Sequence, residues 1–364
     1  MKILLVNYHP AFHLGGSEIQ CDLLADAWNK EGHDVTYLAL GTRTTPEDVK
    51  YKATPTNHDA RSIISGIQEV APDIIYWRCG FNALAKVAGY CRLRSIPLVF
   101  AISAARNVTL WAPRHPQPES NPFIAAARKI RSLKSGIKHR LRIESLRLVP
   151  AAISLSKTLQ DSIPSGLEPD RICTIYNSMS PNPIKDFDWP RPFVFWVANL
   201  KRQKRPERLL CLADPLADLG VDIVMVGAIQ QTYYEKFVAE LPNNIHYLGP
   251  KTVSEVDSIM ESAEVFVHTC KPEGFGNNFI QAWYQGTPTV TFEFDPDGLI
   301  EERKLGFCAR GNNKTFIDSV CRLLEDEQLH GQFSENGEAI ADDLFDIDQN
   351  AKLFCDFFQS LISD

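Results

Sequence analysis

The sequence predicts an α/β protein of two doubly wound units, each a parallel sheet with helices on both faces. Short apolar runs alternate with segments of helical spacing along most of the 364 residues, and this alternation is typical of parallel strands joined by helical crossovers. It stops at a proline-rich stretch and then starts again. The length also suits two domains of about 150–200 residues each.

The first unit is predicted to begin with a buried strand and an amphipathic helix. That helix runs from Ser17 to about Glu31, and the glycine that follows, Gly32, is a residue type that often ends helices. The predicted strands of this unit are Ile3–Asn7, His33–Leu40, Asp73–Trp77, Leu98–Ile102, Ala151–Ser154 and Ile172–Tyr176.

The second unit follows a linker whose prolines can extend neither a helix nor a central strand. Its predicted strands are Phe193–Ala198, Asp222–Val226, Ile245–Leu248, Val265–His268 and Thr289–Phe292. An amphipathic helix over Asn350–Ile362 closes the chain, and its partner is either unit. The expected organisation is a first domain over 1–180, a linker over 181–192, a second domain over 193–345 and the closing helix over 346–364.

Composition and charge exclude several classes of protein. The net charge of −7 argues against a dedicated nucleic-acid binder, which needs a basic surface. Nine scattered cysteines without a Cys-x-x-Cys pair indicate neither a disulfide framework nor a zinc site. The apolar run before Asn7 is too short for a signal peptide, and no run approaches the ~20 residues of a membrane helix. We therefore expect a soluble cytoplasmic protein.

A glycine pair lies between the first strand and the first helix. Gly15 and Gly16 would let the backbone approach a ligand, and the helix N-terminus behind them attracts anions. The alternative is a tight turn in which Ser17 caps the helix and Gln20 completes a capping box. Ile19 stands where a dinucleotide-binding fingerprint would have its third glycine, which weakens a nicotinamide-dehydrogenase interpretation.

Four cations lie within five residues after the first strand of the second unit, in the segment Asn199–Pro206. Lysine at a strand's carboxyl end can neutralise a diphosphate as a point charge. The alternative is a solvated helix start, although cations there oppose the helix dipole.

A third segment, Lys271–Ala282, runs from a strand into a helix. Successive N–H groups near Gly274–Asn277 are predicted to form an anion-binding nest, and Glu273 beside them would orient sugar hydroxyls. The alternative is a carboxylate that only complements the helix dipole.

In order and spacing, these segments resemble the motifs of family-4 (GT4) retaining glycosyltransferases of the GT-B fold, two Rossmann-like domains that face each other across a cleft. The resemblance extends over nearly the whole chain, and its most specific part lies in the second unit. It is carried by Gly15–Glu18, Pro72–Tyr76, Ser154–Lys157, Ile175–Asn177, Glu273–Ala282 and Gly286–Val290.

The resemblance implies a role for each matching position. Gly16, beside Gly15, would lie against the donor diphosphate, which Lys204 would hold. Glu273 would contact the donor sugar, and Gln281 would bind the ribose. The remaining donor-binding residues would be Asn199, Gly274, Phe275, Gly276, Asn277 and Asn278.

Three positions depart from the family pattern. Asn199 stands where an arginine is usual, so one diphosphate-binding cation is missing unless Lys201, Arg202 or Arg205 replaces it. Gln281 replaces a glutamate but still offers a donor and an acceptor to ribose hydroxyls. Ser103 replaces a histidine and cannot supply its charge. Because of these departures, a catalytically weak or silent sugar-nucleotide-binding protein of the same fold remains an alternative. A nucleotide-sugar epimerase is a second alternative, which the residues Glu273–Gln281 disfavour.

The acceptor side is less well marked. Ser103 and His115 are its candidates, and His115 lies in a loop predicted over the cleft. Residues 128–147 are strongly basic and would attract anionic lipid, unless they form a solvated helix face. The segment Asp295–Asp297 looks like a metal-binding Asp-x-Asp motif but is predicted to be a turn.

The function that the resemblance implies is retaining transfer of a sugar from a UDP- or GDP-sugar to a glycan or lipid-linked acceptor, in surface polysaccharide or glycolipid synthesis. It implies no cofactor and no obligatory metal. Lys204 and backbone N–H groups would stabilise the leaving diphosphate. The expected location is the cytoplasm, at the inner face of the membrane if the basic segment binds lipid.

Overall fold

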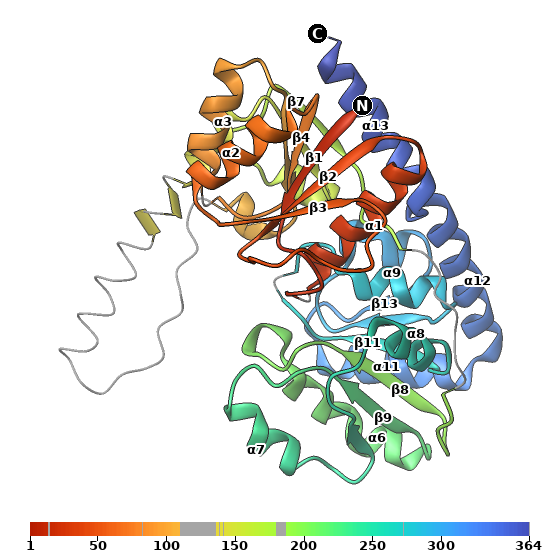
Figure 1. The fold of residues 1–364 in the computed structure, drawn as a ribbon. Coiled ribbons are helices and arrows are strands. Elements are labelled where there is room, and N and C mark those ends of the chain that lie inside the picture. Colours follow the sequence, from red (N-terminus) through yellow and green to blue (C-terminus); the bar gives the residue numbers. More distant parts are fainter. Residues whose placement is uncertain are drawn as a thin grey trace. The chain divides into compact units, whose positions relative to one another are not determined.

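The protein consists of two compact units, shown in the computed structural model (Figure 1). One unit comprises Met1–Asn177 together with Ile347–Asp364, and the other comprises Ser178–Asp346. The structure describes residues 1–13, 15–81, 83–109, 136–137, 139–140, 142–179, 187–271 and 273–363. Each unit contains one parallel sheet interleaved with helices, so the predicted two-unit α/β fold is confirmed.

The first unit is built on a seven-stranded sheet with the order β3-β2-β1-β4-β5-β6-β7. Its strands are β1 Lys2–Asn7, β2 Asp34–Leu40, β3 Lys52–Thr56, β4 Ile74–Trp77, β5 Leu98–Ile102, β6 Ala151–Ser154 and β7 Arg171–Thr174. Its helices are α1 Gly16–Lys30, α2 Ala60–Val70, α3 Leu84–Leu93, α5 Lys157–Asp161 and α13 Ile347–Ile362, with short 3-10 turns η1 Ala105–Asn107 and η2 Glu144–Leu148.

Both faces of this sheet are covered, and β1 shows how. Ile3 and Leu5 pack into the core that α1 and α13 complete, whereas Leu4 and Val6 pack into the core that includes α2 and α3. Successive side chains of a strand point to opposite faces, so a strand covered on both sides is an unbroken apolar run. This explains why a continuous run, rather than an alternating one, predicted β1.

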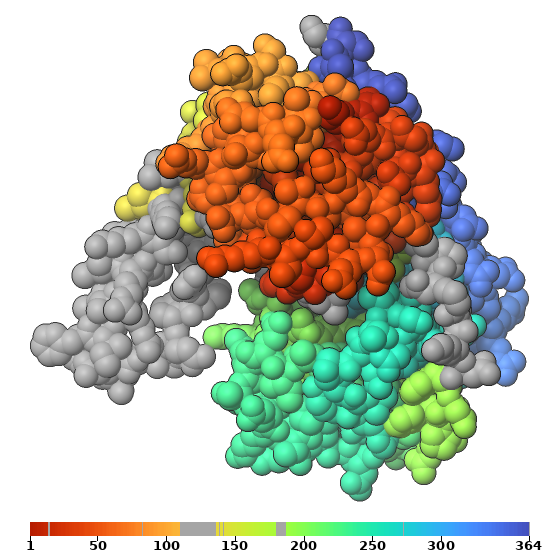
Figure 2. Space-filling view, viewed as in Figure 1, coloured from red at the N-terminus to blue at the C-terminus, as the bar shows by residue number. Residues whose placement is uncertain are grey.

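The closing helix α13 belongs to the first unit. Trp28 on α1 donates from Nε1 to the carbonyl of Ala351 at 3.3 Å. The rings of Phe354 and Phe358 lie 5.7 and 5.5 Å from the Trp28 ring. In the space-filling view α13 (blue) runs along the edge of this unit beside the red N-terminal residues (Figure 2). The sequence left open which of the two units α13 packs against, and this aromatic packing shows that it is the first unit.

The second unit is built on a six-stranded sheet with the order β10-β9-β8-β11-β12-β13. Its strands are β8 Phe193–Val197, β9 Asp222–Val226, β10 Ile245–Tyr247, β11 Val265–His268, β12 Thr289–Thr291 and β13 Gly306–Cys308. Its helices are α6 Ala213–Asp218, α7 Tyr233–Ala239, α8 Val253–Glu261, α9 Asn277–Tyr284, α10 Leu299–Glu302, α11 Asn313–Glu325 and α12 Glu327–Leu344, with 3-10 turns η3 Arg202–Lys204, η4 Pro206–Leu212 and η5 Pro296–Gly298.

Two edge strands, β3 and β13, were not predicted. Strand β3 contains Pro55 and mostly half-buried polar residues, and proline is tolerated in sheets at such edges. Strand β13 is three residues long and begins with Gly306. Its glycine approaches the backbone of Thr289 so closely that a Cβ would lie 1.7 Å from the carbonyl oxygen. Edge strands are often short and carry polar residues or proline, so the sequence signal of β3 and β13 is weak.

Four further observations bear on the sequence predictions. The helix α1 starts at Gly16 with Gly15 as its N-cap, so Ser17 is not the cap that the alternative interpretation assigned to it. All nine cysteines are free. Of the predicted linker, residues 181–186 lie outside the described part of the chain, and Trp189 donates from Nε1 to Asp222 at 3.1 Å. No described helix is long and apolar enough to cross a membrane.

Candidate functional site

Lys204 lies at the end of the loop that follows β8. Its amide donates to the carbonyl of Lys201 at 2.9 Å, which closes the turn η3. Its own carbonyl accepts a hydrogen bond at 2.6 Å from the hydroxyl of Thr269, and that hydroxyl accepts from the indole N–H of Trp196 at 2.9 Å. Thr269 is fully buried. This chain of hydrogen bonds joins the carboxyl ends of β8 and β11 and fixes the backbone of Lys204.

The ammonium group of Lys204 forms an ion pair and hydrogen bond with the carboxylate of Glu273, and each side chain is 20% exposed. Burial acts to lower the pKa of Lys204, but the carboxylate of Glu273 outweighs it and raises this pKa. Burial acts to raise the pKa of Glu273, but His268 and Lys204 hold it well below its usual range. Both groups are therefore charged at neutral pH.

His268 and Cys270 lie beneath this ion pair at the end of β11. The Nε2 atom of His268 is 3.9 Å from a carboxylate oxygen of Glu273, and both His268 and Cys270 are buried. Burial lowers the pKa of His268 against the raising effect of Glu273. Burial and Glu273 raise the pKa of Cys270 to about 12, so its thiol is protonated.

The start of α9 completes the site. Its N-cap is Gly276, which adopts φ 95° and has no side chain to cap the first turn; a Cβ there would lie 3.0 Å from the ring of Phe279. The amide of Gly274 donates to Glu273 at 3.3 Å. Asn278 donates from Nδ2 to the carbonyl of Val197 at 2.7 Å and so ties α9 to the end of β8. The positive end of a helix dipole thus faces the carboxylate.

A second ion cluster lies at the end of β12. Glu293 accepts hydrogen bonds from Lys271 and, at 2.7 Å, from Arg205. Arg205 also donates to the carbonyl of Thr269 at 2.8 Å and lies over the ring of Phe292. These contacts hold the side chain of Arg205 in place, whereas Lys201 is partly exposed and Arg202 is exposed.

Asn199 has a local structural contact. Its side-chain oxygen accepts from the amide of Ala228 at 3.1 Å and so joins the ends of β8 and β9. The neighbouring Gly227 adopts φ 145°, and a side chain is excluded there because a Cβ would lie 1.9 Å from the carbonyl oxygen of Ala198.

The structure places two predicted donor-binding side chains inside the unit. The side chain of Phe275 is 3% exposed and packs against Trp283 and Phe345, so only its backbone can face a ligand. Gln281 is 7% exposed and donates from Nε2 to Asp257 at 2.7 Å. In this structure the side-chain nitrogen of Gln281 is bonded to a residue of α8. Ribose binding by Gln281 stays a prediction.

The predicted residues of the first unit lie at its own strand ends. Gly15 is extended, with φ −157°, directly before α1. Ser103 follows β5 and donates from its amide to Asn107 at 3.1 Å. His115 lies outside the described residues, as does most of the basic segment 128–147.

The Asp-x-Asp segment is a turn, as predicted. Asp295 accepts from the amide of Ile300 at 2.9 Å, and Asp297 adopts the left-handed conformation with φ 53°. The segment therefore caps the start of α10.

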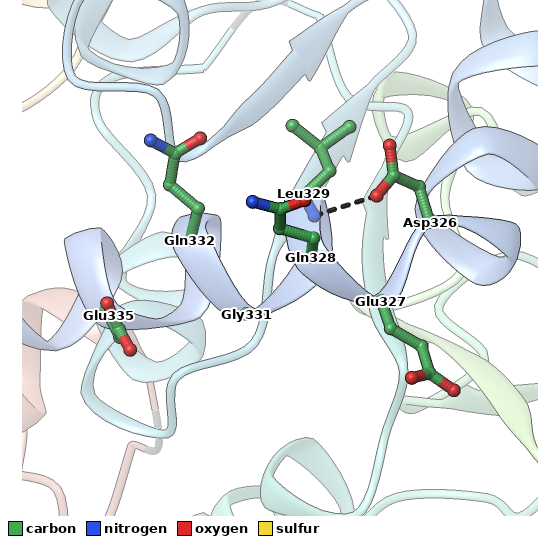
Figure 3. Close-up of a pocket in the computed structure, with 7 residues that line it drawn as sticks. All are labelled: Asp326, Glu327, Gln328, Leu329, Gly331, Gln332 and Glu335. Carbon is green, nitrogen blue, oxygen red and sulfur yellow. Dashed lines mark hydrogen bonds between the residues drawn. The ribbon is translucent and has the colours of Figure 1, made fainter.

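A hollow of about 490 Å³ on the second unit is lined by residues of α12 and the residue before it, and includes neither Lys204 nor Glu273. Figure 3 shows it along the first turns of α12, where Asp326 caps the helix by accepting from the amide of Leu329 at 3.0 Å. Its lining is acidic and amide-rich, unlike the paired charges at the ends of β8 and β11: Asp326, Glu327, Gln328, Leu329, Gly331, Gln332 and Glu335.

Sequence reasoning missed the residues that support the pair. Thr269 and Glu293 hold the loops of Lys204 and Arg205, while His268 and Cys270 lie under Glu273. The one available signal was their position, because all lie at or just after the carboxyl ends of strands that share one edge of the sheet. Of the predicted residues, the structure brings together Lys204, Glu273, Gly274, Gly276 and Asn278.

Residues 183–340 match the model of the family described as glycosyl transferases group 1. No curated protein sequence matches the chain significantly.

Solved structures match over the full length. HepE of Anabaena, in complex with UDP and glucose, is 19% identical with a TM-score of 0.71, over 99% of this chain and 100% of that one. Sucrose-phosphate synthase of Thermosynechococcus elongatus is 14% identical with a TM-score of 0.78, over 100% and 99%. WaaG, a glycosyltransferase involved in lipopolysaccharide biosynthesis, is 14% identical with a TM-score of 0.69, over 98% and 99%. The chain therefore has the GT-B fold, and its residues 183–340 match the model of the glycosyl transferases group 1 family.

Proposed function

We propose that the protein is a retaining family-4 glycosyltransferase that moves a sugar from a nucleotide-diphosphate donor, a UDP- or GDP-sugar, to a glycan or lipid-linked acceptor. The observation that carries the proposal is the ion pair between Lys204 and Glu273, which lies at the carboxyl ends of β8 and β11 beside the N-terminus of α9. Open α/β sheets bind ligands at this edge.

The two charges suit the two halves of such a donor. An ammonium group has three N–H donors, so Lys204 can hold a phosphate oxygen as well as Glu273. The carboxylate of Glu273 accepts hydrogen bonds only, and sugar hydroxyls donate them. The dipole of α9 and the N–H groups near Gly274 add positive potential for the diphosphate.

Transfer breaks the bond between the anomeric carbon and the diphosphate, and negative charge develops on the leaving oxygen. Lys204 is fixed in place before the donor arrives, because its backbone is held by Thr269. Preorganised charge of this kind stabilises a transition state without reorganisation during the reaction. The proposal requires no metal, so turnover should persist in a chelator.

Similarity to other proteins supports the donor class. HepE of Anabaena has been solved with UDP-glucose, and that structure is 19% identical to this chain with a TM-score of 0.72. For the acceptor, we propose a surface polysaccharide or glycolipid, because residues 128–147 are basic and would attract an anionic membrane. The protein would then lie at the inner face of the cytoplasmic membrane, and its binding to anionic liposomes should weaken with salt.

The test is release of free UDP or GDP from a panel of nucleotide sugars, after a thermal-shift screen has shown which of them bind. We expect slow hydrolysis of one donor, with the released sugar first appearing as the anomer of the donor configuration. Glu273→Ala should abolish it, whereas Glu240→Ala, which removes an exposed carboxylate of the same unit, should not. Binding without hydrolysis or transfer would favour the silent sugar-nucleotide-binding protein, and no thermal shift with any nucleotide sugar would refute the donor site.

A further inference from the structure

A cluster of three metal-ligating side chains lies within the second unit. The imidazole of His268, the thiol of Cys270 and the carboxylate of Glu273 each offer one ligand atom, and these atoms all lie within 4.8 Å of one another. Imidazole, thiolate and carboxylate are the ligands that bind Zn²⁺ in proteins, at about 2.0–2.3 Å. A single ion between the three groups would need only small side-chain movements.

Two observations show that the cluster has spare binding capacity. His268 is 5% exposed, and its Nδ1 atom is buried without a hydrogen-bond partner among the described residues. Glu273 is the most accessible of the three groups, with 20% of its side chain exposed, so an ion can enter over it.

We propose that His268, Cys270 and Glu273 form a binding site for Zn²⁺, and that an ion there competes with Lys204 for Glu273. The thiol of Cys270 loses its proton to solvent when the metal binds, since the thiolate is the ligand. Three protein ligands leave a fourth position for water. The site is an inhibitory one, because the metal takes the carboxylate that the donor sugar needs; this inhibition, but not the binding itself, rests on the proposed function.

Competition between Zn²⁺ and Lys204 for Glu273 predicts the direction in which the affinity for Zn²⁺ changes when Lys204 is replaced. The ammonium of Lys204 is bonded to Glu273 and repels an incoming cation. Removing that charge by Lys204→Met should therefore raise the affinity for Zn²⁺. An ion bound at some other cysteine or histidine of the chain would not respond to this substitution.

The experiment is a titration of the full-length, nucleotide-free protein with Zn²⁺ in competition with a chromophoric chelator. We expect one Zn²⁺ ion per chain to bind at this site in competition with the chelator. Cys270→Ser should weaken it by at least about tenfold, as loss of even an outer-shell partner of a metal often does. Lys204→Met should tighten it. Co²⁺ in place of Zn²⁺ should show a thiolate-to-metal charge-transfer band that Cys270→Ser removes.

Two controls address the other thiols and the other metal-ligating cluster. Cys211→Ser removes a half-buried thiol of the same unit, and His33→Gln disrupts a second cluster formed by Glu31, His33 and Cys355 in the first unit. Neither should change the affinity of the site or its cobalt band. Circular dichroism of Cys270→Ser would verify that the variant is folded.

The proposal is overturned if wild-type protein and folded Cys270→Ser compete equally for Zn²⁺, or if His33→Gln alone removes binding. Failure of the transferase proposal would look different: Zn²⁺ would bind as described, yet no nucleotide sugar would shift the melting temperature. If both proposals hold, Zn²⁺ should slow donor hydrolysis by the wild type.

Discussion

Gln281 donates a hydrogen bond from Nε2 to Oδ1 of Asp257 at 2.7 Å, and this contact joins α9 to α8 in the interior of the second unit. Both residues are buried, with exposures of 7% and 3%. A glutamate at position 281 would bring a second carboxylate against Asp257. Two buried carboxylates in contact cannot both ionise at neutral pH.

Gln281→Glu should therefore destabilise the protein by about 1–3 kcal/mol at neutral pH, the cost of an unsatisfied buried group. The repulsion raises the pKa of the carboxyl pair in the folded state. The loss should accordingly shrink as pH falls toward 5 and one carboxyl takes up a proton. Urea denaturation at two pH values measures this, and Asp257→Asn in the same background should restore stability. A Gln281→Glu protein as stable as wild type at pH 7 would contradict it.

Lys204→Ala should weaken the binding of free UDP or GDP by roughly 10–100-fold, since a hydrogen bond to a charged group contributes about 1.5–3 kcal/mol. Calorimetric titration measures the affinity. The matched control is Lys236→Ala, because Lys236 is an exposed lysine of the same unit whose side chain is 80% exposed. Equal affinities of the Lys204 and Lys236 variants would rule out Lys204 as a diphosphate ligand.

The stability contributed by Glu273 should depend on pH in one direction. The pKa of Glu273 is depressed in the folded state, so its contribution is complete above the pKa of the unfolded chain, about 4.3. It is lost as pH falls further toward the folded pKa. Glu273→Gln should cost about 2 kcal/mol at pH 7 and less near pH 3.5. Chemical denaturation at both pH values checks this, and a cost that grew on acidification would be incompatible with the depressed pKa.

Gly276 should be intolerant of a side chain. It adopts φ 95°, and a Cβ would meet the ring of Phe279 at 3.0 Å, so Gly276→Ala should destabilise by about 1–3 kcal/mol. The control is Gly331→Ala, because Gly331 lies inside α12 with no atom within 4 Å of an added Cβ. That substitution should stabilise by about 0.5–1 kcal/mol, since alanine favours helix. Thermal unfolding of both variants tests the difference in sign.

Thr269→Val should weaken the site by removing buried hydrogen bonds beneath Lys204. Thr269 accepts from Trp196 and donates to the carbonyl of Lys204, so valine leaves two buried groups unsatisfied. We expect a loss of about 2–4 kcal/mol and weaker UDP binding, because the backbone of Lys204 is no longer fixed. Thr269→Ser should retain both properties. Unchanged UDP affinity in a destabilised valine variant would limit Thr269 to a structural role.

Much of the fold could be predicted because central parallel strands are continuous apolar runs. β1, β4 and β5 are covered on both faces, and their sequences show it without any knowledge of their neighbours. The edge strands β3 and β13 could not be predicted, because a proline, polar residues or a short length suffices at an edge. The partner of α13 was also open, since an amphipathic face does not specify which apolar surface covers it.

For the candidate site, the sequence by itself determined which segments of the chain form it. Lys204, Glu273 and the glycines before α9 each follow a strand, and a parallel sheet brings such loops to one edge. Only the tertiary structure decided which side chains meet: that Glu273 pairs with Lys204, that Gln281 is bonded to Asp257, and that His268 and Cys270 lie under the pair. The physical reason is that strand periodicity fixes where a loop begins, whereas contacts across 24 to 69 positions of the chain depend on how several elements pack together.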